Sequence, residues 1–134
     1  LDGDVMITFV PAVHSSNVGE GAKITPGGNP GGFVIAIKNG PTLYHTGDTD
    51  VFGDMALVNE LHKPDVGIVP IGVRFTMGAR TAAFACQHYF QFKAVLPCHY
   101  GTFPGMLDAD ADAFVAEMKG HNVIVPKVGE TVSP

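Results

Sequence analysis

Short apolar runs separated by Gly, Pro and polar residues occur along most of the chain and predict strands. The first of them, 5–13, is apolar on both faces, which indicates a strand covered on both sides. The Asn-Gly pair at 39–40 joins two such runs and predicts a β-hairpin, with Pro41 at the start of its second strand. Between 15 and 31 the Gly-rich sequence predicts a loop. The strands expected are 5–13, 32–38, 42–45, 65–71, 93–98 and 122–128.

Other segments have apolar residues at helical spacing and predict helices over 54–63, 79–90 and 108–120. Asp54 is placed to cap the first, Lys63-Pro64 to end it, and Lys119-Gly120 to end the third. Three acidic residues sit at the positive end of the third helix, which is the best defined. The residues expected on buried faces are Leu57, Val58 and Leu61; Ala79, Ala82, Ala83, Cys86 and Phe90; and Ala111, Phe114, Val115 and Met118.

Hairpin strands come first along the chain, and alternating helix and strand units follow. This order predicts a mixed α/β (α+β) fold in which helices pack on a sheet. At 134 residues the chain has the size of a single domain.

Charge and cysteine content narrow the function classes. A formal net charge of −5 with only 8 Lys and Arg argues against a nucleic-acid partner. No apolar run is long enough to span a bilayer, and the first residues do not resemble a secretory signal, so we expect no membrane association. The spacing of Cys86 and Cys98 matches no zinc or redox motif, so we expect a reduced, cytoplasmic protein, although a disulfide between them stays open.

Three polar clusters each follow an apolar strand, and they contain His14, Asp48 and His99. Strand ends are where side chains from separate segments converge, and His with Asp are ligand types for zinc, manganese or iron. Each residue also has a simpler interpretation: a strand-end His is commonly just hydrogen-bonded, and Asp48 after Gly47 could cap a turn. The other histidines, His62, His88 and His121, are assigned structural roles, and His45 is ambiguous.

Several long motifs in a fixed order carry a family resemblance. "GDTDVFGDM", "PDVGIVPIGVRFTMG" and "PCHYGTFPG", preceded by "PAVHSS" and "GNPGGFVI", resemble the metal-dependent hydrolase branch of the metallo-beta-lactamase superfamily, near the ascorbate-6-phosphate lactonases. The resemblance implies a four-layer αββα sandwich with a metal site along the edge of its two sheets. It also implies that His14 completes a first metal site, Asp48 bridges two metals and His99 belongs to the second site.

The function implied is hydrolysis of an ester, lactone or phosphoester in a small-molecule substrate by a hydroxide that bridges two divalent ions, zinc or manganese. The alternative is a non-catalytic binding protein with the same fold. His45, Thr46 and Thr49 are candidates to hold the ligands in place. Arg74 could bind an anionic substrate group or form a surface ion pair, and Tyr100 could donate to an oxyanion or pack beside the site.

Two departures from the family pattern bear on these expectations. The His-x-His-x-Asp-His motif is absent, so we expect residues 1–134 to be the C-terminal part of one hydrolase domain whose N-terminal part is missing or on another chain. We therefore expect these residues to be inactive or insoluble alone. In "TMGART" (76–81), Ala79, Arg80 and Thr81 stand where relatives tend to have Pro and acidic residues. The sequence has no signal for or against a homo-oligomer.

Overall fold

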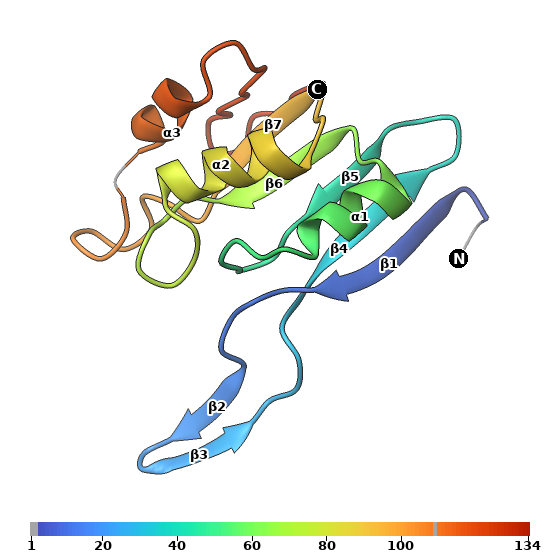
Figure 1. Ribbon diagram of the computed structural model, residues 1–134. Helices are drawn as coiled ribbons and strands as arrows, with labels where there is room; N and C mark the ends of the chain where they lie inside the picture. Colours follow the sequence, from blue (N-terminus) through green and yellow to red (C-terminus); the bar gives the residue numbers. More distant parts are fainter. Residues whose placement is uncertain (1–2, 109) are drawn as a thin grey trace.

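A five-stranded sheet with helices on it forms the body of the protein (Figure 1). The computed structural model describes residues 3–108 and 110–134. The sheet order is β1-β4-β5-β6-β7, and β2 and β3 form a separate two-stranded sheet. The strands are β1 (Val5–Pro11), β2 (Asn17–Glu20), β3 (Lys23–Pro26), β4 (Gly31–Ile37), β5 (Thr42–His45), β6 (Val66–Pro70) and β7 (Ala94–Cys98). The helices are α1 (Met55–His62), α2 (Ala79–Tyr89) and α3 (Asp112–Glu117).

Strand direction decides where the polar clusters meet. β1 and β5 both run antiparallel to β4, whereas β5, β6 and β7 run parallel to one another. The helical crossovers through α1 and α2 permit this parallel arrangement, because parallel neighbours cannot be joined by a tight turn. The carboxyl ends of β1, β5, β6 and β7 therefore lie at the same edge of the sheet.

The predicted hairpin is confirmed. β4 and β5 pair with Ala36 opposite Thr42, and the backbone N–H of Gly40 donates to the carbonyl of Ile37 at 3.0 Å. Asn39 has a φ of 58°, which Asn tolerates better than most residues. The Asn-Gly signal therefore identified both the turn and the two strands that it joins.

The predicted loop over 15–31 is wrong in part, because it contains the β2–β3 hairpin, which projects beyond the main sheet (Figure 1). Val18 pairs with Thr25, and the chain turns at Gly21, which has a φ of 59°. Both strands are exposed. A four-residue strand without a buried face carries no periodic hydrophobic pattern, so the sequence did not reveal it.

The strand predicted over 122–128 is also wrong. Only one isolated bridge forms, between Val95 and Val123, with the N–H of Val95 donating to Asn122 and that of Ile124 donating to Val95, both at 2.9 Å. The next bonds of such a parallel ladder would need N–H groups from Pro97 and Pro126, which proline lacks. The pairing with β7 therefore stops after one bridge.

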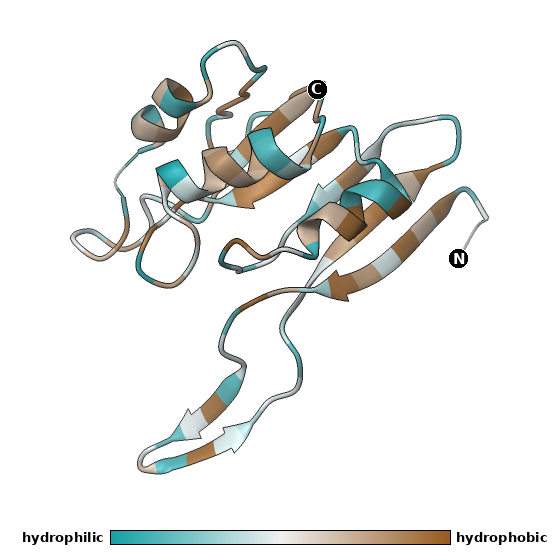
Figure 2. Ribbon diagram, in the orientation of Figure 1, coloured by the Kyte–Doolittle hydropathy of each residue, from teal (hydrophilic) through white to brown (hydrophobic). Residues whose placement is uncertain are grey.

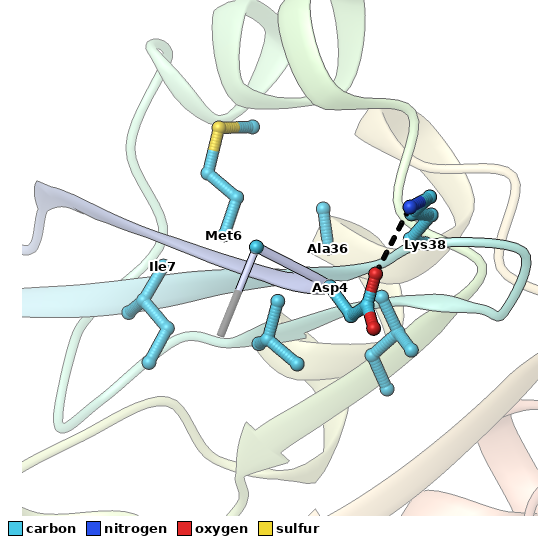
Figure 3. A pocket seen from close by; sticks show the side chains of 8 residues that line it. Asp4, Met6, Ile7, Ala36 and Lys38 are labelled. Atoms are coloured by element: carbon cyan, nitrogen blue, oxygen red, sulfur yellow. Dashed lines mark hydrogen bonds and ion pairs between the residues drawn. The ribbon is translucent and has the colours of Figure 1, made fainter. Parts of the chain in front are cut away.

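β1 is an edge strand with both faces largely exposed, so the expectation that it is covered on both sides is wrong for these residues. Met6, Ile7 and Phe9 are exposed, and only Val10 is buried. Figure 2 shows the strand's apolar composition. A hollow of about 550 Å³ lies along β1 and β4. Figure 3 shows side chains that line it, among them Asp4, which pairs with Lys38 at 3.1 Å. The sequence of β1 is typical of a buried strand, but no other element that the structure describes packs on most of its surface.

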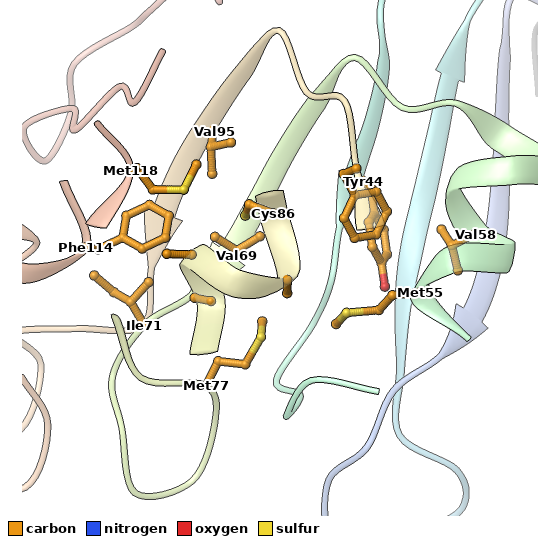
Figure 4. Close-up of a cluster of buried hydrophobic side chains, with 14 of the residues drawn as sticks. Tyr44, Met55, Val58, Val69, Ile71, Met77, Cys86, Val95, Phe114 and Met118 are labelled. Atoms are coloured by element: carbon orange, nitrogen blue, oxygen red, sulfur yellow. The ribbon is translucent and has the colours of Figure 1, made fainter. Parts of the chain in front are cut away.

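The core lies between the sheet and the helices (Figure 4). On α2 the predicted face is buried at every position except Ala79, which is partly exposed. On α1 the buried residues are Met55 and Val58, whereas Leu57 and Leu61 are exposed, which corrects the predicted face. None of the described helices is long and apolar enough to cross a membrane.

Helix ends differ from the expectations at two places. Asp54 occupies the N-cap position of α1 but makes no side-chain cap hydrogen bond, while Lys63 ends the helix in the left-handed conformation. α3 has six residues, shorter than predicted, and Val115 is exposed while Phe114 and Met118 are buried. The part of the predicted helix at residue 109 lies outside the described residues.

Candidate metal centre

Asp48 lies in a sharp turn at the end of β5 that its neighbours hold in place. Gly47 has a φ of 69°, and a Cβ there would lie 2.3 Å from the carbonyl oxygen of Gly31, so only glycine fits. The hydroxyl of Thr46, which is buried, donates to the Gly47 carbonyl at 3.0 Å. Thr49, also buried, donates to the Asp50 carbonyl at 2.7 Å. The turn therefore leaves Asp48 exposed at the sheet edge.

His99 follows β7 and faces Asp48 across the end of β6. Its Nε2 lies 3.6 Å from Oδ2 of Asp48, with 26% of the His99 side chain and 52% of the Asp48 side chain exposed. His99 has a φ of 57°, and its carbonyl oxygen would lie 2.0 Å from a Cβ at Gly72. Gly72, two residues after β6, thus allows the backbone of His99 to approach closely.

The donor set suits a divalent metal ion. Nδ1 of His99 is buried and has no hydrogen-bond partner among the described residues, and the 3.6 Å separation of Nε2 from Asp48 exceeds hydrogen-bonding distance. Ligand atoms bound to one tetrahedral metal at 2.0–2.2 Å are about 3.3–3.6 Å apart. An imidazole nitrogen and a carboxylate oxygen at this spacing fit two ligands of one ion.

His14 lies on the segment after β1, which is tied to the same turn. The N–H of Val13 donates to Thr49 Oγ1 at 2.9 Å, and the N–H of Asp50 donates to the Val13 carbonyl at 2.9 Å. The His14 ring points elsewhere, with Nδ1 at 2.6 Å from the carbonyl of Ser15. Within residues 3–108 and 110–134, no group of three His, Cys, Asp or Glu side chains is close enough to hold a metal. The role of His14 as a ligand stays a prediction.

The remaining candidates fall into different environments. His45 is exposed, and its Nδ1 accepts the N–H of Gly47 at 3.1 Å, which supports the turn before Asp48. Tyr100 packs against the core beside the site. Arg74 is exposed and makes no ion pair with any carboxylate of the described residues, so its alternative interpretation as a surface ion pair gains no support.

Sequence reasoning missed Cys98 as a neighbour of the site. Burial raises the pKa of its thiol to about 11, with the negative charge of Asp48 as the second cause. The thiol therefore stays protonated near neutral pH and is a poor nucleophile. Cys86 is buried and Cys98 is partly exposed, and both cysteines are free, so the disulfide left open by the sequence does not form. The position of Cys98 directly before His99 was the available signal.

In "TMGART" (76–81), where the sequence departs from the family pattern, Thr81 has a local structural role. Gly78 is the N-cap residue of α2. The Gly78 N–H donates to Thr81 Oγ1 at 3.0 Å, and the Thr81 hydroxyl lies 3.1 Å from the Gly78 carbonyl. Thr81 thus satisfies backbone groups at the start of the helix.

Comparison with known proteins gives consistent results. The sequence profile of the Beta-lactamase superfamily domain matches residues 1–100. A UPF0173 metal-dependent hydrolase of Mesorhizobium japonicum is 54% identical over 98% of this chain and 57% of its own length. One from Methylocella silvestris is 54% identical over 95% of this chain and 55% of its own. The chain thus spans about half the length of these curated relatives.

Solved structures of hydrolases also match the fold of this chain. Igni18, a metallo hydrolase from the hyperthermophilic archaeon Ignicoccus hospitalis, matches with a TM-score of 0.82 and 34% identity over 98% of this chain and 53% of that one. An isothiocyanate hydrolase from Delia radicum gut bacteria shares the fold, with a TM-score of 0.74 at 17% identity over 99% of this chain and 56% of that one. With the profile match over most of its length, the chain belongs to the metallo-beta-lactamase superfamily.

Proposed function

We propose that the protein is a metal-dependent hydrolase that cleaves an ester, lactone or phosphoester bond in a small molecule. The observation that carries this proposal is the approach of His99 Nε2 to Asp48 Oδ2 at 3.6 Å, at the edge where four strands end. The names of its relatives, which are metal-dependent hydrolases, support the same class of activity.

Asp48 and His99 would hold the metal, with His14 as a third ligand if its ring turns away from Ser15. Zinc and manganese both accept imidazole nitrogen and carboxylate oxygen. When bound, such ions polarise the electrophile of the substrate and make hydroxide available near neutral pH. Two facing side chains leave a coordination shell incomplete, so we expect further ligands from outside these 134 residues.

The residues around Asp48 give the site its rigidity. Gly47 sets the direction of the turn, Thr46 and Thr49 hold it through hydroxyl hydrogen bonds, and His45 accepts the Gly47 N–H. Groups that fix the orientation of a metal ligand raise metal affinity because less ordering is required on binding. Tyr100, the residue after His99, packs against the core, and its proposed role is to donate a hydrogen bond to charge that develops on the substrate.

The test is a substrate screen on the full-length natural protein. Lactones, carboxylate esters, phosphodiesters and beta-lactams would be offered to protein stripped with a chelator and then reloaded with zinc or manganese. We expect hydrolysis of at least one class that disappears on chelation and returns with metal. Turnover that is indifferent to chelation, or no turnover of any class by protein shown to be metal-loaded, contradicts the proposal.

A further inference from the structure

The loop between β6 and α2, residues 72–78, runs between the two proposed metal ligands. At its start, Gly72 lies so close to His99 that a Cβ there would be 2.0 Å from the His99 carbonyl oxygen and 2.9 Å from Nδ1. Near its end, the N–H of Met77 donates to the carbonyl of Thr49, the residue after Asp48, at 3.0 Å. The loop is therefore fixed at both ends to the site.

The middle of this loop is a tight, strained turn. Val73 has a φ of 65° and Arg74 a φ of 36°, in the left-handed region that side chains with a Cβ rarely adopt, and Val73 is β-branched. The N–H of Val73 donates to the Met77 carbonyl at 3.2 Å, and that of Thr76 donates to the Val73 carbonyl at 3.0 Å. Strain of this kind persists only where the surrounding structure enforces it, and it is concentrated at functional sites.

Arg74 stands at the apex of the turn, two residues from Gly72 and so within about 7 Å of it along the backbone. Its side chain is exposed, and in the described parts of the chain no carboxylate pairs with it. The protein has a net charge of −5 and only 8 Lys and Arg, and Arg74 is the cation on the loop whose two ends contact His99 and Thr49. Guanidinium binds carboxylate and phosphate through two parallel hydrogen bonds.

We propose that Arg74 makes the site selective for substrates that carry an anionic group, a carboxylate or a phosphate, close to the bond that is hydrolysed. This inference rests on the proposed hydrolase function. Arg74 binds the charged group of the substrate and takes no part in the chemistry of bond cleavage, and the strained turn fixes the backbone from which its side chain extends.

The test compares matched substrates in the metal-loaded full-length protein. The neutral ester is 4-nitrophenyl acetate, and the anionic esters are mono-4-nitrophenyl glutarate and 4-nitrophenyl 3-phosphonopropanoate. The variant Arg74→Asn removes the charge while Asn tolerates the left-handed backbone, Arg74→Lys keeps the charge without the planar fork, and Arg80→Gln on α2 is the matched control.

We expect R74N to lower the ratio of kcat/KM for the anionic to the neutral ester by about 10- to 100-fold, R74K to lower it less, and R80Q to leave it unchanged. The anionic ester whose kcat/KM falls more in R74N shows which group Arg74 prefers, carboxylate or phosphate. A ratio unchanged in R74N, or lowered as much in R80Q, overturns the proposal.

A binding measurement separates this inference from the hydrolase function. Titration calorimetry with the anionic anilide N-(4-nitrophenyl)succinamic acid and the neutral 4-nitroacetanilide reports on recognition without turnover. If the metal-loaded wild type hydrolyses none of these esters and no class of the substrate screen described above, the hydrolase proposal fails. The role of Arg74 then stands only if the anionic anilide binds the wild type at least about tenfold more tightly than R74N. Equal affinity, or no binding to either protein, overturns it.

Discussion

Nε2 of His99 and Oδ2 of Asp48 lie 3.6 Å apart although the two residues follow different strands, β7 and β5. The strand between them, β6, ends at Pro70, and Gly72, two residues further on, has no side chain and so leaves room for His99. The meeting of the two groups thus depends on parallel strand order and on one glycine. Both features are open to direct tests.

Replacing Gly72 with Ala should displace His99. The added Cβ would lie 2.0 Å from the His99 carbonyl oxygen, which is backbone and cannot swing away as a side chain can. We expect a loss of stability of about 1–3 kcal/mol and a weaker metal affinity, measured by urea unfolding and by metal titration. Gly53→Ala is the control, because nothing lies within 4 Å of a Cβ there. Equal behaviour of the two variants would rule out this role for Gly72.

Much of the fold could be predicted because its signals are local. The Asn-Gly turn, the end of α1 at Lys63 and the apolar face of α2 each depend on neighbouring residues, and each is confirmed. The misses depend on context that neighbours do not carry. The exposed β2–β3 hairpin has no buried face to detect, and the last strand fails because prolines interrupt its ladder with β7.

The candidate site also has features that the sequence predicted and features that it did not. Strand order brings Asp48 and His99 together as strand-end reasoning expects, whereas the orientation of the His14 ring toward Ser15 depends on local hydrogen bonding. Nothing in the residue types of 72–78 shows that Met77 is bound to Thr49 or that Val73 is strained. Those features come from the tertiary arrangement, so the setting of Arg74 was outside the reach of pattern reasoning.

Tyr44 is fully buried against Phe90, and its hydroxyl has no hydrogen-bond partner among the described residues. A buried hydroxyl without a partner has lost its hydration with no compensation. We expect Tyr44→Phe to raise the free energy of unfolding by about 1 kcal/mol in urea titrations, with Tyr89→Phe on α2 as the control that changes it little. A clear loss of stability in Y44F would mean that the hydroxyl has a partner in solution.

Asp65 should make stability depend on acid pH. Its Oδ1 lies 2.8 Å from Lys93 Nζ, and its Oδ2 accepts the Thr42 N–H at 2.9 Å. The hydrogen bond from Lys93, then that from Thr42, lowers the pKa of this carboxyl below its usual value. A lowered folded-state pKa gives stability that is present above the unfolded-state pKa of about 4 and is lost as pH falls through the folded value.

The measurement is urea unfolding of the wild type and Asp65→Asn between pH 7 and pH 3. We expect the wild type to be the more stable at pH 7 and the difference to shrink as the pH falls below about 4, because Asp65 becomes protonated. A difference that stays constant over the whole range would show that the carboxylate charge is not its cause.

The metal content of the full-length natural protein tests the central claim most directly. After loading with zinc or manganese and removal of excess ion, elemental analysis of the wild type should find at least one metal per chain. Asp48→Asn and His99→Gln should each lower metal affinity by about tenfold or more, since even residues behind a ligand have effects of that size. His88→Gln, which alters a ring stacked on Phe84 in α2, should leave the affinity unchanged. Fewer than one metal per wild-type chain, or equal metal binding by all four proteins, would contradict the assignment of Asp48 and His99 as metal ligands.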